Sequence, residues 1–453
     1  MTLQVESTAR TGTPPIADNK GDKTMSIKGD NKTPTPLPPQ LQRRKLLQGV
    51  TAMAGMTALG FPAISLAQNK PIRIGMPTIL SGRVAMLGQA STNAAQMEVE
   101  KFNAAGGLGG RKIELVIRDS KGQPQEAARV ARELVTAEGC EIIYDAEASS
   151  GAFAVHEVAR DLGVLVIHTC SETSALSADP KLRTPLAFRC ARQGVHDAVI
   201  GGAYAAKVAK EKNLKRWMTC SPDYAYGRDT TAEFIDYLKY FNKEVEVIGD
   251  VWPKLFQADY SENITRLLQG NPQAVYSCLW GGDLTSFIDQ STIYALFKDR
   301  QFFGVNMADY AVLHNVKAVP AGLHSGNRYL KSFPNNPGNA AWSNAYQAKY
   351  KDLPLNWAWQ NAAGIQFLTT AMKKANSADG KKIATVLTGL TIDSPFGANG
   401  KLTLRAEDHT LVDYALGWGE LSGKEPFMAN PVPGNWKQIA ELEAEWKKRK
   451  GFA

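Results

Sequence analysis

From Lys70 onward, short runs rich in β-branched residues alternate with longer amphipathic runs, and no other feature constrains the fold as strongly. The first series begins at residue 71 with "PIRIGMPTIL" and ends at residue 186 with "LAFRCA". Helix-like segments such as "PQEAARVARELVTAEG" separate the strand-like ones. Parallel strands need crossover connections, which are usually helices. The alternation therefore predicts a doubly wound α/β unit here.

The same rhythm restarts at residue 197 with "DAVIGGAYAAKVAKEK" and continues to "QFFGVN" at residue 301. The expected fold class is α/β, with two doubly wound, Rossmann-like units joined by close crossings, because no low-complexity linker separates them. Further on, "PLNWAWQNAAGIQFLTTAMKKA" predicts a late helix and "PFGANGKLTLRAEDHTLVDYALGWGEL" predicts a closing hairpin. The tail "NWKQIAELEAEWKKRK" predicts a charged helix on the surface.

Residues 1–67 differ from the rest in composition. A polar, Pro-rich segment predicts a disordered n-region, and the pair Arg43-Arg44, the apolar run from Val50 to Phe61 and a small-residue cleavage site predict a twin-arginine signal peptide. The apolar run is shorter than the roughly 20 residues that a membrane span needs. We therefore expect an exported, periplasmic protein, whose start at Met1 or Met25 stays open.

The distribution of charge and the spacing of the cysteines argue against two classes of function, nucleic-acid binding and cysteine-based metal or redox chemistry. About half of the net charge of +8 lies within residues 1–67, so the remaining chain has no cationic cluster and no nucleic-acid partner is expected. The five cysteines show neither C-x-x-C nor Cys/His spacing. In an exported protein, either Cys170 with Cys190 or Cys220 with Cys278 could pair, and burial as small apolar side chains is the alternative.

The usual motifs of catalysis are missing from the sequence. The "GGLGG" run at residues 106–110 follows a predicted helix and precedes a strand, which is the wrong order for a phosphate-binding loop. His168 near Cys170 and Glu172 has neither an orienting third group nor oxyanion donors. We therefore expect no enzyme activity, no cofactor and no metal site.

In open α/β sheets, ligands bind beyond the carboxyl ends of the strands, so the loops there are the candidates for a site. In the first unit these loops carry hydroxyl groups and backbone amides, at Ser149, Ser150, Ser171 and Thr173. In the second unit they carry rings, at Tyr224, Tyr226, Trp280 and Tyr310. Donors on one wall and rings on the other suit a small ligand with a polar head and an apolar or amide body.

Several segments together carry a family resemblance: "IGMPTILSGRVAMLGQ", "FNAAGGLGGRKIELVIRDS", "GVLVIHTCSETSAL", "SPDYAYGRD" and "WAWQNAAGIQFLTTAMKKA" before "SPFGANGKLTL". From about Pro71 to about Leu421, the chain resembles the type I periplasmic solute-binding proteins of ABC importers, the receptors for branched-chain amino acids, amides and urea. The resemblance implies a monomeric Venus-flytrap fold with three crossovers and a membrane permease as partner. It places residues 70–190 and 322–392 in lobe 1, residues 191–321 and 393–430 in lobe 2, and a helical extension at 431–453.

The resemblance also implies the ligand contacts. The hydroxyl and amide of Ser149 and the backbone of Cys170 and Glu172 would hold the polar head, with Ser150 and Ser171 beside them. Tyr224, Tyr226 and Trp280 would line the second lobe. Three departures from the family pattern bear on the ligand: Leu87 replaces an aromatic wall residue, Glu172 replaces a hydroxyl residue, and Asn306 and Asp309 compete for the acidic position.

Glu172 leaves the ligand class open. Pointing inward, its carboxylate would repel an anionic head and favour an amide or a cation, whereas pointing to solvent it would contribute only its N–H group. The expected function is capture of a small solute by closure of the lobes, with a branched-chain or hydrophobic amino acid, an amide or a related compound as the solute. The alternatives are a ligand-sensing receptor module of the same fold and a hydrolase that uses the cleft.

Overall fold

The computed structural model describes residues 70–428 and 431–453. The predicted n-region and signal peptide at residues 1–67 lie outside the described residues. Within the described part of the chain, every helix is too short or too polar to cross a membrane.

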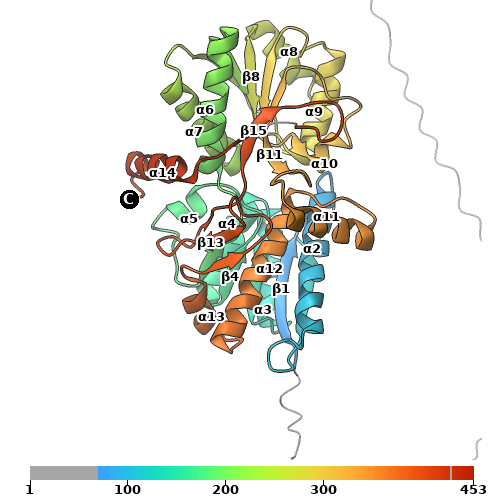
Figure 1. Ribbon diagram of the computed structural model, residues 1–453, viewed down its shortest axis with the longest axis vertical. Helices are drawn as coiled ribbons and strands as arrows, with labels where there is room; N and C mark the ends of the chain where they lie inside the picture. The colour runs from blue at the N-terminus through green and yellow to red at the C-terminus, as the bar shows by residue number, and fades with distance from the viewer. Residues whose placement is uncertain (1–69, 429–430) are drawn as a thin grey trace, which may run out of the picture. The chain divides into compact units, whose positions relative to one another are not determined.

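The first sheet has five parallel strands in the order β2-β1-β3-β4-β5. These strands are β1 (Ile72–Thr78), β2 (Ile113–Asp119), β3 (Ile142–Asp145), β4 (Leu165–His168) and β5 (Ala187–Arg189). Its helices are α2 (Ala85–Ala104), α3 (Pro124–Thr136), α4 (Ser149–Leu162), α5 (Ala175–Ala178), α11 (Pro337–Tyr350), α12 (Asn356–Ala375) and α13 (Gly380–Leu387). Among these, α12 packs on α2 and α3 packs on α4. Figure 1 shows these elements gathered around the first sheet.

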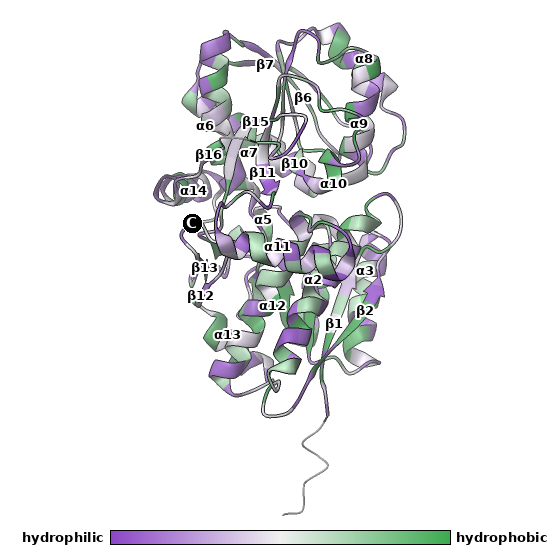
Figure 2. Ribbon diagram, turned by 45° about the vertical axis from the view of Figure 1, so that its right-hand side comes forward, coloured by the Kyte–Doolittle hydropathy of each residue, from purple (hydrophilic) through white to green (hydrophobic). Residues whose placement is uncertain are grey.

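The second sheet runs in the order β16-β15-β11-β9-β8-β6-β7, and β10 pairs with β11 off this path. Its strands are β6 (Arg216–Cys220), β7 (Glu246–Val251), β8 (Ala274–Ser277), β9 (Gln301–Gly304), β10 (Ala308–Asp309), β11 (Leu323–Tyr329), β15 (Gly417–Glu420) and β16 (Val432–Pro433). Its helices are α6 (Gly194–Lys212), α7 (Ala225–Phe241), α8 (Ser261–Gly270), α9 (Gly281–Ile293) and α10 (Tyr310–Leu313). Figure 2 shows hydrophilic and hydrophobic residues alternating along the covering helices, as the sequence pattern predicts.

Strand pairing differs from the predicted lobe boundaries in two places. Strand β11 pairs with β9 and β15, so residues 323–329 belong to the second sheet and not to lobe 1. A small sheet of β12 (Thr391–Asp393), β13 (Lys401–Leu404) and β14 (Leu411–Val412) lies against the first sheet, because Thr410 forms a β-bridge with Arg189. The polar sequence of β11 has no apolar run, which is why its membership was not predicted.

The alternation of strands and helices follows the sequence prediction through both units. Helix α11 was not predicted, although Asn336 caps it by accepting a hydrogen bond from the N–H of Asn339 and Pro337 begins it. All five cysteines are free and buried, so neither predicted disulfide forms and the thiols pack as small apolar groups.

The C-terminal helix α14 (Trp436–Lys450) was predicted to lie on the surface but is partly buried. It packs on α6 and buries Ile439, Leu442 and Trp446. Its Glu443 accepts hydrogen bonds from Arg405, at 2.7 Å to each terminal nitrogen, and lies 3.0 Å from Nε2 of His196. Burial alone would raise the pKa of Glu443, but these partners hold it well below its usual value. The helix therefore ties both lobes together through one buried carboxylate.

Replacing Glu443 should destabilise the whole fold. Glu443→Ala removes the buried carboxylate that Arg405, Lys447 and His196 share and leaves Arg405 with Asp408 as its buried partner, so we expect a loss of about 3 kcal/mol in the free energy of unfolding. Urea denaturation measures this loss. Glu445→Ala, on the exposed face of the same helix, should change the stability by less than about 0.5 kcal/mol. Equal effects of the two substitutions would contradict the assignment.

Candidate functional site

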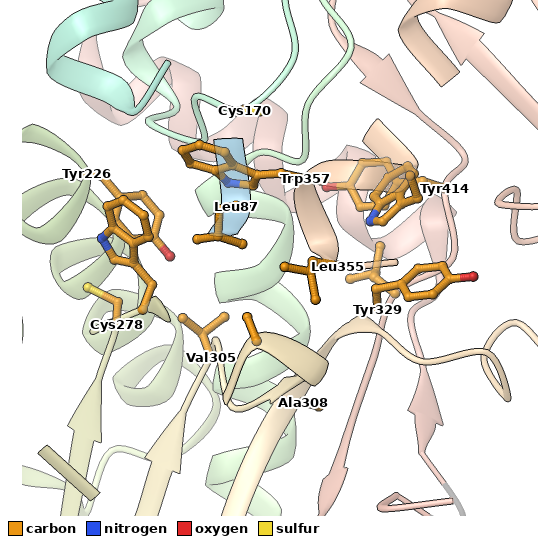
Figure 3. Packing of buried hydrophobic residues seen from close by; sticks show 14 of the residues in the cluster. Leu87, Cys170, Tyr226, Cys278, Val305, Ala308, Tyr329, Leu355, Trp357 and Tyr414 are labelled. Atoms are coloured by element: carbon orange, nitrogen blue, oxygen red, sulfur yellow. The ribbon is translucent and has the colours of Figure 1, made fainter. Parts of the chain in front are cut away.

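A cavity lies where the carboxyl ends of the strands of the two sheets face each other. About 440 Å³ of empty space lies among its lining residues, and this volume includes space that is open to solvent. The cavity is lined by residues of both lobes, namely Leu87, Ala148, Ser149, Cys170, Glu172, Tyr224, Tyr226, Trp280, Gly281, Asn306, Asp309, Arg328, Asn356 and Trp357. Figure 3 shows Leu87 next to the rings of Tyr226 and Trp357.

The first-lobe wall is built on the start of α4. Ser149 is the first residue of this helix, and its Oγ accepts a hydrogen bond from the hydroxyl of Ser171 at 3.3 Å and from the N–H of Thr173 at 3.4 Å. Its own hydroxyl proton is therefore free to donate. The N-terminus of an α-helix also carries partial positive charge that favours an anionic group. Ser150 and Ser171, which were predicted beside Ser149, do not line the cavity.

The second-lobe wall is built from rings. Tyr224 caps α7 with an extended backbone and Tyr226 lies in its first turn, so the predicted turn "SPDYAYG" runs directly into the helix. The Tyr226 oxygen accepts a hydrogen bond from Nδ2 of Asn306 at 2.9 Å, which leaves its own proton to donate. Trp280 and Trp357 approach from opposite lobes, with ring centroids 5.7 Å apart. Tyr310 lies outside the cavity lining.

Glu172 points into the cavity, and its charge is balanced. It is buried and ion-paired with Arg328, and its second oxygen accepts a hydrogen bond from Asn356 at 3.0 Å. Arg328 also donates to Asp197 at 3.1 Å, and Asp197 is paired in turn with Arg192 at 2.5 Å. The two arginines balance the two carboxylates. The repulsion of an anion that an isolated Glu172 would cause is therefore largely cancelled.

Among the residues that the structure describes, Asp309 is the acid in the cavity that has no cationic partner within ion-pair distance. It caps α10 and accepts hydrogen bonds from the N–H groups of Asn356 at 3.2 Å and Ala311 at 3.5 Å. Burial raises its pKa to about 7, against these hydrogen bonds and the attraction of Arg328. Of the two residues predicted to compete for the acidic position, Asn306 is committed to Tyr226 and to the carbonyls of Cys278 and Leu279.

The predictions missed the residues that enter the cavity from the crossing segments. Arg328 is the penultimate residue of β11, and because this segment was not predicted as a strand its carboxyl end was not inspected. Asn356 and Trp357 begin α12, in the quoted segment "NWAWQ", where an aromatic residue at a helix start was the available signal. Gly281 and Ala148 contribute close backbone and gave no signal of their own.

A nucleophile pair of His168 and Cys170, which the sequence did not favour, is not formed. Nδ1 of His168 lies 2.6 Å from Oδ2 of Asp145 and its Nε2 lies 3.1 Å from Nδ1 of His156, so both ring nitrogens are occupied elsewhere. Burial also raises the pKa of the Cys170 thiol, which disfavours the thiolate. The part of the chain that the structure describes contains no cluster of side chains suited to a metal ion.

Comparison with known proteins gives a consistent family. The family model described as periplasmic binding protein matches residues 71–416. The Leucine-, isoleucine-, valine-, threonine-, and alanine-binding protein of Pseudomonas aeruginosa is 24% identical over 369 residues, which is 80% of this chain and 94% of that protein. The Leu/Ile/Val-binding protein of Escherichia coli is 25% identical over 358 residues, 78% of this chain and 91% of that protein.

Solved structures share the fold. A solute-binding protein of an ABC transporter from Rhodopseudomonas palustris, in complex with 3,4-dihydroxybenzoic acid, has a TM-score of 0.71 at 21% identity and covers 80% of this chain and 96% of its own. A branched-chain amino acid transporter substrate-binding protein from Streptococcus pneumoniae, in complex with isoleucine, has a TM-score of 0.66 at 21% identity, covering 80% and 99%.

Removing Arg328 should unbalance the cavity. In Arg328→Gln, Glu172 becomes a buried carboxylate without a cation, and we expect a loss of about 3 kcal/mol in the free energy of unfolding. The double variant Arg328→Gln with Glu172→Gln should recover most of this loss, because neither buried charge remains unpaired. Urea denaturation of both variants measures the difference, and equal losses would contradict the pairing.

Proposed function

The chain belongs to the periplasmic binding protein family, and on that premise we propose that its cavity captures one small zwitterionic solute, a hydrophobic amino acid or a close relative. The protein is the exported, periplasmic substrate-binding component of an ABC importer. It performs no chemistry on the solute. Closure of the lobes around the solute would present the closed surface to the membrane permease, because only the closed state makes both sets of contacts.

The observation that carries the proposal is Asp309. A buried acid with a pKa of about 7 gains a partner when a solute brings an ammonium group beside it. The solute's carboxylate would then face the hydroxyl of Ser149 and the N-terminus of α4. Its apolar body would lie among Leu87, Trp280 and Trp357. The residues therefore provide one place for each part of an amino acid.

An aromatic monocarboxylate is the second candidate. Arg328 is the one cationic residue that lines the cavity within the described chain, and its Nε has no hydrogen-bond partner. Together with the ring-lined wall, this donor favours a flat anion. Such a ligand would leave Asp309 protonated. The two candidates therefore differ in how their affinity depends on pH: the affinity for an amino acid should rise with pH, and the affinity for an aromatic anion should fall.

Several finer points belong to the proposal as well. The pair Arg43-Arg44 supports the twin-arginine route of export. We propose a monomer without a nucleic-acid partner. Co-purification with a permease, rather than with a sensor kinase, distinguishes the importer from a receptor module of the same fold. Recovery of intact solute after prolonged incubation would contradict the alternative that the protein is a hydrolase.

The pH dependence of binding separates the candidates. With a pKa of about 7, Asp309 is mostly protonated at pH 6 and mostly ionised at pH 8. An ammonium prefers the ionised form, so the affinity for L-leucine should rise roughly tenfold between pH 6 and pH 8. The affinity for benzoate should fall over the same range. Isothermal titration calorimetry at both pH values measures the slope.

Asp309→Asn is the matched control for this prediction, because it keeps the shape of the side chain and removes its titration. The slope between pH 6 and pH 8 should disappear in this variant. A persisting slope would assign the proton to another group, and absence of binding by any amino acid or aromatic acid would contradict the proposed solute class.

The hydroxyl of Tyr226 should contribute to affinity separately from its ring. Tyr226→Phe removes the free donor and keeps the apolar surface, and we expect roughly tenfold weaker binding of whichever probe binds. Tyr226→Ala should weaken binding further, because the wall is lost as well. Tyr240→Phe, on an exposed ring of the same helix, should leave the affinity unchanged. Unchanged affinity in Tyr226→Ala would remove this residue from the site.

A further inference from the structure

One arginine of the first lobe binds the start of a helix of the second lobe. This contact lies outside the cavity, at the mouth of the cleft. Arg83 follows β1, and its Nε donates to Oδ1 of Asp283 at 3.0 Å. Its Nη2 donates to the carbonyl of Gly282 at 3.1 Å and to the hydroxyl of Ser286 at 2.5 Å. All three acceptors lie in the first two turns of α9. A single side chain thus makes three polar contacts between the lobes.

Two glycines make this approach possible. A Cβ atom at Gly282 would lie 2.7 Å from the backbone oxygen of Arg83, closer than atoms pack. Gly281 has a φ of +52°, and a Cβ there would lie 3.2 Å from Cγ1 of Val84. Only glycine is free of both restrictions, since it has no Cβ. The first two residues of α9 are therefore shaped to receive the loop that carries Arg83.

The carboxylate of Asp283 is held in place by a contact within its own lobe. Its Oδ2 accepts a hydrogen bond from the N–H of Phe256 at 2.8 Å, and the residue is 1% exposed. The Phe256 ring in turn lies near Gly122 of the first lobe, where a Cβ would be 3.3 Å from it. The carboxylate is thus fixed before Arg83 arrives, and Arg83 from the other lobe is the cation with which it forms an ion pair. Arg83 itself does not line the cavity.

We propose that Arg83 is a positioning residue for solute binding: with the N-terminus of α9 it forms a latch that favours the closed cleft regardless of which solute is inside. The proposal rests on capture of a solute by lobe closure. The solute enters the open cleft and is held once the lobes close, so the apparent affinity scales with the equilibrium constant for closing. A latch therefore strengthens the binding of every solute by the same factor. It keeps part of the protein closed even without solute.

The closed fraction is measured without any solute, so the test stands apart from the identity of the ligand. Spin labels on Lys207→Cys in α6 and Lys374→Cys in α12 report the distance between the lobes by double electron–electron resonance. Both positions are exposed, whereas the five native cysteines are buried. The wild-type latch should give a short-distance population, and Arg83→Ala should reduce it roughly tenfold.

Matched variants separate the latch from general damage. Arg83→Lys keeps the charge but loses the fork that reaches three acceptors, and it should restore part of the short-distance population. Gly282→Ala should also reduce that population, although it removes no charge. Arg132→Ala breaks an exposed ion pair with Asp161 within the first lobe and should have no effect. Arg83 is partly exposed and Asp283 can reach water when the cleft opens, so Arg83→Ala should lower the melting temperature much less than Arg328→Gln does.

Kinetics with L-leucine and benzoate complete the test. For whichever probe binds, Arg83→Ala should raise the dissociation rate constant roughly tenfold and leave the association rate constant nearly unchanged. If both bind, their affinity ratio should stay the same. A wild-type protein that shows only the long distance, or an Arg83→Ala variant with unchanged distances, would overturn the latch while leaving solute capture intact.

Discussion

The ion pairs of Arg328 are the interaction on which the site depends. One guanidinium at the end of β11 holds Glu172 of the first lobe and Asp197 of α6. Burial opposes its charge, yet the two carboxylates raise the pKa of Arg328 above its usual value. Removing one member of a buried ion pair is costly, because it leaves the other charge buried without compensation. The cluster therefore fixes the relative placement of three segments that are far apart in the sequence.

The same cluster sets the charge that the cavity presents. Because Arg192 and Arg328 balance Asp197 and Glu172, the cavity presents no large net charge from these four residues. The remaining acid, Asp309, carries a pKa of about 7 and can change its charge in response to a solute. A site with one adjustable acid can adapt to a cationic group without the cost of an always unpaired buried carboxylate.

Sequence reasoning reached the fold and part of the cavity lining for a clear reason. The strands of the first unit are short runs rich in β-branched residues, and the loops at their carboxyl ends, which carry Ser149 and Cys170, follow from the rule for open sheets. In the second unit, Tyr226 and Trp280 stand at strand ends and were found in the same way. These predictions needed only local patterns and one topological rule.

Neither the local sequence pattern nor the rule for open sheets could predict the role of Arg328. This residue lies in a buried strand with a polar sequence, which has no apolar run to indicate a strand. Its partner Glu172 is 156 positions away along the chain. For the same reason the orientation of Glu172 stayed open, since its cost depends on a cation that only the fold brings near. The disulfide alternatives failed differently, because spacing along the chain carries no information about the buried positions that the thiols occupy.

The position of the charged cluster in the fold explains how a rigid pair of lobes can still move. Arg192 stands where the chain first crosses between the lobes, and Arg328 stands just before the second crossing. Near the third, Tyr414 accepts a hydrogen bond from the N–H of Gln193 at 3.2 Å, and its ring lies under the Arg192 guanidinium at 5.2 Å. Interactions at a hinge change little in length when the lobes rotate, whereas those at the mouth, such as Arg83 with Asp283, change most. Charge balance at the hinge can therefore persist in the open state, and the contacts that distinguish open from closed are those of the solute and of the mouth.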